Sequence, residues 1–155
     1  MNERLFGLPA PIIVRARKTM FVPDEHFVED SSDTAKVKII SIGGIFKEHF
    51  LGARSTIDPP RVETLLCVRR LLVPANSTQI TAIQEREAKA PPTLGEIFSL
   101  MEKQPHGENG DLLTNPDLLN LFFLNDMFGK PNVVMVGWHK RKFGWIIGAD
   151  YVETE

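Results

Sequence analysis

Hydrophobic residues recur along this chain in two patterns, an alternation typical of strands and a three-to-four spacing typical of helices. The helical spacing is clearest at 94–103, where Leu94, Ile97, Phe98 and Met101 share one face. Thr93 and Glu96 before it match the T-x-x-E capping box, and a proline and a glycine-rich loop follow it. We therefore predict a helix at about 94–103.

The last third of the chain is patterned like a sheet. Residues 133–138 and 144–152 are rich in β-branched and aromatic residues, and a polar turn at 140–143 separates them. Residues 118–128 are apolar on every side, so a buried strand and a helix both fit. We prefer a strand at 119–124, so that the chain closes with a C-terminal β-hairpin or meander.

The N-terminal half also contains strand patterns. Ile12 to Met20 alternates in a way that places Arg15 and Arg17 on one face of a half-buried strand, and Val14 on the other. Residues 35–42 predict a second strand, which Gly43 and Gly44 interrupt. The run 45–51 is too short for periodicity to decide between helix and strand.

Residues 62–73 fit either a helix or a strand. Prolines on both sides would suit a helix, but Arg69 would then lie in the middle of its apolar stripe. A strand places Arg69 in an alternating face, so we prefer a strand paired as a hairpin with 79–84.

These segments predict an α+β fold that is β-rich, with a mainly antiparallel sheet. The length of 155 residues and an apolar content of 43% suit a single domain spanning 1–155. An internal hinge is placed at 85–93, where charged residues alternate with alanine and two prolines follow.

The chain has one cysteine, Cys67, which excludes an intramolecular disulfide and a thiol cluster for zinc. We find no signal-peptide pattern, and no apolar stretch approaches the roughly 18 to 20 residues that cross a bilayer. We expect a soluble, cytoplasmic protein without a membrane partner.

The net charge of −2 is unevenly distributed. Residues 1–90 carry 13 Lys and Arg against 11 acids, and residues 91–155 carry 5 against 9. Three of those five cations, Lys140, Arg141 and Lys142, are consecutive. The turn that they form is therefore a basic island in an acidic half of the chain.

Aromatic residues flank this basic turn. The candidate binding residues here are Trp138, His139, Lys140, Arg141, Lys142 and Trp145. Such a mixture suits stacking on bases and contact with phosphates, but the net charge disfavours nucleic acid as a partner. The alternative is that both tryptophans belong to the core and the charged tip is only solvated.

Arg15 and Arg17 form a second candidate binding site. With Lys36 and Lys38 on a neighbouring strand, they would make a basic sheet face that meets an acidic partner. A solvated outer face explains the same residues equally well.

No catalytic motif is present. Glu48 and His49 lack the accompanying pattern of a known catalytic motif, and the loop from His106 to Asp111 has oxygen ligands without EF-hand spacing. We therefore predict no metal and no cofactor, and interpret the loop as a polar turn.

The pattern as a whole favours an intracellular binding or regulatory module that acts through a protein-interaction surface. One alternative is a small enzyme whose site is assembled from His49, His106, Glu48 and Asp111. Another is a structural subunit, or a homo-oligomer, that uses the apolar segment 118–128.

Overall fold

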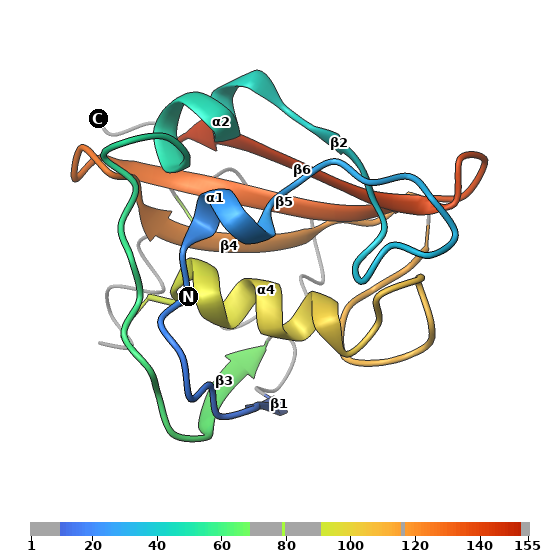
Figure 1. Cartoon of the computed structure of the whole chain (residues 1–155), viewed down its shortest axis with the longest axis horizontal. Coiled ribbons are helices and arrows are strands. Elements are labelled where there is room, and N and C mark those ends of the chain that lie inside the picture. Colours follow the sequence, from blue (N-terminus) through green and yellow to red (C-terminus); the bar gives the residue numbers. More distant parts are fainter. Residues whose placement is uncertain (1–9, 69–78, 80–90, 116, 153–155) are drawn as a thin grey trace.

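A computed structural model describes residues 10–68, 79, 91–115 and 117–152 (Figure 1). The predicted α+β class is confirmed, with two sheets, mostly antiparallel pairing and few helices. The elements are β1 (Ala10–Val14), α1 (Pro23–His26), β2 (Ile39–Ile42), α2 (Gly44–Phe50), β3 (Thr64–Val68), α4 (Leu94–Glu102), β4 (Asn120–Asn125), β5 (Pro131–His139) and β6 (Gly144–Tyr151).

The larger sheet has four strands in the order β2-β6-β5-β4. Its β4, β5 and β6 form an antiparallel meander, which confirms the strand preferred at 119–124 over a helix. β2 adds to β6 in the parallel direction, a pairing that the sequence did not predict. The smaller sheet is the antiparallel pair β1–β3.

Helix α4 lies between the two sheets, with the four-stranded sheet on one side and β1–β3 on the other (Figure 1). Its predicted capping box is present: Glu96 N–H donates to Thr93 Oγ1 at 3.1 Å, and Thr93 N–H donates to Glu96 Oε1 at 3.0 Å. Every residue from Leu94 to Met101 is buried. Because α4 is covered on both sides, even its polar residues Glu96 and Ser99 are buried.

The two faces of the four-stranded sheet differ. Val134 and Val136 of β5 point into the main core together with Trp145 and Ile147 of β6, as strand alternation requires. We call the opposite side the outer face. A small separate cluster of Phe123, Val133 and Val152 lies on that face.

Several segment predictions need correction. The strand expected over Ile12 to Met20 ends at Val14, although its alternation is real, since Ile12 and Val14 are buried and Ile13 is exposed. The strand expected at 35–42 is shorter, Ile39–Ile42. The undecided run 45–51 lies largely in helix α2. Phe46 and Phe50, one turn apart, both face the core.

The preference for a strand at 62–73 is confirmed over Thr64–Val68, and 69–73 lies outside the described residues. In the expected partner strand 79–84 only Gln79 is described, and its backbone is helical. Most of the expected hinge at 85–93 also lies outside the described residues.

Among the described helices none could cross a membrane. The longest, α4, has 9 residues. At 1.5 Å per residue it is about 14 Å long, against about 30 Å of hydrocarbon core.

Candidate functional site

The turn between β5 and β6 carries the basic residues singled out in the sequence. The strands stay paired up to Trp138 opposite Trp145 and His139 opposite Gly144. Residues 140–143 make the turn, and Lys142 N–H donates to His139 Nδ1 at 3.1 Å. His139 therefore organises the turn with an unprotonated ring nitrogen.

The two tryptophans lie in different environments. Trp145 is fully buried in the main core, and its Nε1–H donates to the carbonyl oxygen of Gln104 at 2.9 Å. Trp138 is half-buried, and its ring packs directly over Gly107. Trp145 is thus a structural residue, whereas Trp138 still reaches the surface.

Phe143 at the end of the turn is an exposed aromatic residue. Its side chain is 61% exposed, and its φ of 51° lies in the left-handed region, which non-glycine residues rarely occupy. Backbone strain of this kind costs about 1 to 3 kcal/mol and is concentrated at functional sites. Phe143 is not among the binding residues predicted from the sequence, because neither its exposure nor its backbone conformation has a sequence signal.

The three cations of the turn, Lys140, Arg141 and Lys142, are all exposed. None takes part in the ion pairs found among the described residues. We call these three residues together with Phe143 the basic tip. Its charges are available to a partner, since no described neighbour neutralises them.

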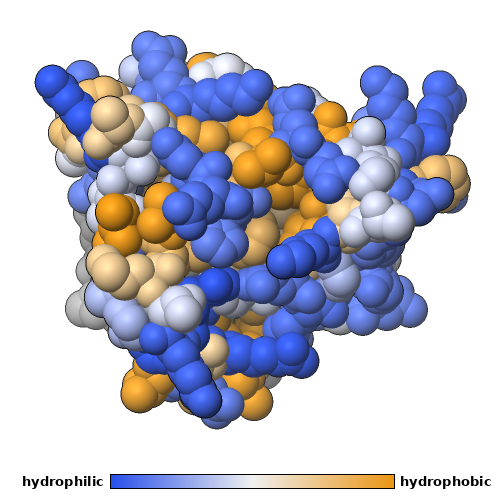
Figure 2. Space-filling model, in the orientation of Figure 1, coloured by the Kyte–Doolittle hydropathy of each residue, from blue (hydrophilic) through white to orange (hydrophobic). Residues whose placement is uncertain are grey.

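A shallow pocket of about 390 Å³ adjoins the basic tip. It is lined by Trp138, His139, Lys140, Arg141 and Ile146. Figure 2 shows hydrophilic side chains projecting at the right-hand end of the molecule, where Figure 1 places the β5–β6 turn. The structure therefore brings five of the predicted binding residues, Trp138 to Lys142, to one surface and withdraws Trp145 from it.

Arg15 and Arg17 do not join this surface. They follow β1, which Figure 1 places on the far side of α4 from the four-stranded sheet. Lys38 belongs instead with the hairpin, because its carbonyl oxygen accepts the N–H of Trp145 at 2.8 Å. Arg15 and Arg17 thus follow β1, and Lys36 and Lys38 precede β2, so the four residues expected to make one basic face lie beside strands of different sheets.

Arg17 is held inside the fold. Its guanidinium pairs with Glu102 of α4 and lies over the Phe21 ring at 5.1 Å, while Arg15 is exposed. Arg61 pairs with Arg17 through backbone hydrogen bonds just beyond the ends of β1 and β3, and its guanidinium donates to Ser99 Oγ. Burial is the main cause that lowers the pKa of Arg61, opposed by nearby Glu96. These arginines fasten β1–β3 to α4.

The four residues named for an enzyme do not form a site together. Glu48 is exposed on α2, and His49 on the same helix is buried. The ring of His106 donates through Nε2 to the carbonyl oxygen of Ala35 at 2.8 Å, and Asp111 pairs with Lys103. Among the described residues no hydrogen bond or ion pair joins any two of these four.

His49 instead belongs to a buried polar chain that the sequence did not reveal. Its Nδ1–H donates to Asn132 Oδ1 at 2.9 Å, and Asn132 Nδ2–H donates to Asp126 Oδ2 at 2.9 Å. Asp126 Oδ1 also accepts the N–H groups of Phe128 and Lys130, both at 2.9 Å. This chain fixes the β4–β5 turn against α2, a structural task.

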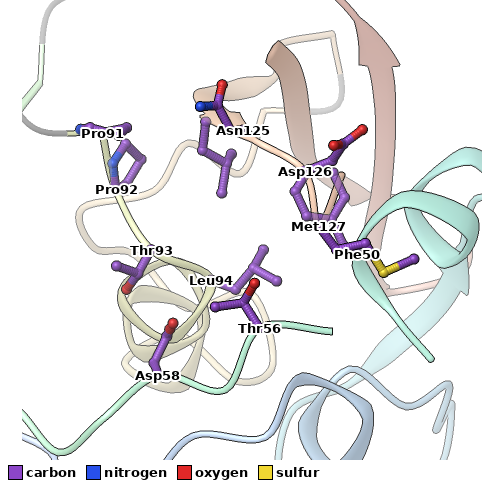
Figure 3. Close-up of a pocket in the computed structure, with 11 residues that line it drawn as sticks. Phe50, Thr56, Asp58, Pro91, Pro92, Thr93, Leu94, Asn125, Asp126 and Met127 are labelled. Atoms are coloured by element: carbon purple, nitrogen blue, oxygen red, sulfur yellow. The ribbon is translucent and has the colours of Figure 1, made fainter. Parts of the chain in front are cut away.

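A second cleft, of about 210 Å³, lies between the start of α4, the segment after α2 and the end of β4 (Figure 3). Its acidic and hydroxyl groups are largely committed to the fold. Asp58 Oδ2 accepts the N–H of Gly95 at 2.7 Å, Thr93 caps α4, and Asp126 holds the β4–β5 turn. The remaining lining is mostly apolar, so the cleft has no cluster of free catalytic groups.

Within the described part of the chain, no group of three or more His, Cys, Asp or Glu side chains is arranged to hold a metal ion. In comparisons with known proteins, no family model, no curated protein and no solved structure matches this chain.

Proposed function

We propose that this chain is an intracellular binding module that captures an acidic protein partner at the basic tip. The observation that carries the proposal is the exposed Phe143 beside three cations without a described ion pair. Aromatic and arginine side chains are the usual anchors of protein interfaces. An acidic partner is favoured by charge complementarity.

The rigid support of the tip favours binding. The turn lies at the end of two long paired strands, and the buried Trp145, the second residue of β6, anchors the hairpin in the core directly after the turn. The backbone of such a scaffold is already ordered, so it loses little conformational freedom when a partner binds. The left-handed Phe143 adds a specific reason, because this residue keeps an exposed ring at a backbone cost.

A protein partner fits better than nucleic acid. The formal net charge of the chain is −2, and the half that contains the tip is acidic apart from it. Affinity for a phosphate backbone rises with every phosphate neutralised, and three cations neutralise few. The single cysteine favours a reducing compartment such as the cytoplasm.

The test is affinity capture from extracts of the native host, followed by mass spectrometry. A triple variant with Lys140, Arg141 and Lys142 changed to Ala should lose the captured partner. A matched triple variant at the exposed cations Lys18, Arg54 and Lys130 should keep it. Equal capture by the two variants would contradict the proposal.

Phe143→Asn tests the aromatic anchor separately. Asparagine tolerates the left-handed region, so the variant should unfold at the same or a higher denaturant concentration. We expect it to bind the partner about tenfold more weakly or worse. Undiminished binding by a folded Phe143→Asn protein would remove Phe143 from the site.

A further inference from the structure

The outer face of the four-stranded sheet carries an exposed apolar surface that leads to the basic tip. On β4, Leu121 is 41% exposed, and Leu119 just before the strand is 47% exposed. Leu121 pairs with Met135 of β5, and Met135 pairs with Gly148 of β6. We call the residues Leu119, Leu121, Met135 and Ile146 the apolar strip.

Two glycines leave positions on this surface from which no side chain projects. Gly137 and Gly148 lie on the outer face and carry no side chain there. A Cβ at Gly137 would lie 2.8 Å from Leu119 Cδ2 and 3.5 Å from Ile146 Cγ1, so both of these side chains flank the glycine. Met135 Cε lies 3.6 Å from the corresponding point at Gly148. The strip is thus an apolar surface in which Leu119 and Ile146 flank Gly137 and Met135 lies against Gly148.

The strip and the basic tip are continuous. Ile146 belongs to the strip and also lines the pocket beside the tip, together with His139, Lys140 and Arg141. A ligand lying along β5 would therefore meet apolar side chains first and cations at its end. Exposed contiguous apolar surface with a charged rim is typical of protein-interaction sites.

We infer that the partner binds through a short peptide segment whose apolar side chains lie on the apolar strip and whose carboxylates reach the basic tip. This inference rests on the function proposed above and specifies the chemistry of the partner. The occupant is fixed by charge complementarity, because the cations at one end of the strip have no described ion-pair partner. A purely acidic segment would leave the strip uncovered.

The experiment is a selection of random peptides displayed on phage against the wild-type protein. The selected peptides are then synthesised with a fluorescent label, and their affinities are measured by anisotropy. We expect a consensus in which acidic residues are followed or preceded by apolar ones. A consensus with acids and no apolar position would overturn the inference.

Variants separate the two parts of the surface. Leu119→Ser with Leu121→Ser should weaken the selected peptides by about tenfold or more. A matched pair at exposed apolar residues elsewhere, Val62→Ser with Leu65→Ser, should change the affinity by less than about twofold. Circular dichroism of each variant checks that it is folded.

The outcomes distinguish this inference from the proposed function. If peptide binding depends on Lys140, Arg141 and Lys142 but not on Leu119 and Leu121, the inference that the apolar strip binds the peptide is wrong. The proposed function of the basic tip is then retained. Peptides insensitive to both sets of changes would overturn both proposals, as would tighter binding of oligothymidylate than of any selected peptide. A Leu119 and Leu121 variant that unfolds is replaced by Leu121→Gln alone.

Discussion

Trp138 and Trp145 pack edge to face across β5 and β6, with ring centroids 5.2 Å apart and ring planes at 79°. One ring is in the core and the other reaches the surface beside the basic tip. The pair therefore connects the interior of the fold to the proposed binding site.

The two tryptophans should contribute unequally to stability. Trp145→Phe removes buried volume and leaves the carbonyl oxygen of Gln104 without its indole donor, so we expect a loss of about 2 to 4 kcal/mol. Trp138→Phe should cost about 1 kcal/mol, because this ring is only half-buried. Urea unfolding measures both, and equal losses would contradict the assignment of Trp145 to the core.

Gly107 should tolerate no side chain. A Cβ at this position would lie 2.5 Å from the ring of Trp138, and the φ of 77° adds backbone strain. Gly129 has a φ of 78° with nothing within 4 Å, so Gly129→Ala has the strain without the clash. Gly107→Ala should therefore lower the melting temperature more than Gly129→Ala. It should also displace Trp138 and change its fluorescence.

Replacement of Asp126 should strongly destabilise the β4–β5 turn. Asp126→Ala removes the side-chain acceptor of the partly buried N–H groups of Phe128 and Lys130 and of the buried amide of Asn132. We expect a loss of about 3 kcal/mol, measured by denaturant unfolding. The exposed Asp117→Ala is the control and should change stability by less than about 0.5 kcal/mol. A small effect at Asp126 would show that the polar chain to His49 is dispensable.

Glu29 should titrate below its usual range. The N–H of Ile42 is the largest cause that lowers the pKa of this carboxyl, and Lys47 lowers it further. Because the folded pKa is lowered, the stabilisation by Glu29 is present above the unfolded pKa and is lost as the pH falls through the folded pKa. NMR titration measures the pKa directly.

Glu29→Gln supplies the matching control for this titration. The wild type should be more stable than Glu29→Gln at neutral pH, and the difference should disappear in acid. A difference that persists when the carboxyl is fully protonated would assign the effect to shape rather than charge.

The fold was predictable where the pattern is local. The helix at 94–103 followed from its spacing and from Thr93 and Glu96, which bond to each other within one turn. The meander followed from β-branched strands with short polar turns, because such turns allow antiparallel neighbours to pair. The parallel addition of β2 to β6 joins segments about a hundred residues apart, and no local signal records it.

The binding site was predictable only in part. The sequence alone placed three cations between two tryptophans at one turn, because a hairpin keeps consecutive residues together. Only the tertiary structure decided which aromatic rings face solvent: burial withdrew Trp145 and left Phe143 exposed. Likewise it attached Arg17 to Glu102 and His49 to Asn132, residues more than 80 positions apart. Burial and pairing depend on which distant segments pack together, and a periodic pattern determines only the face that each segment turns inward.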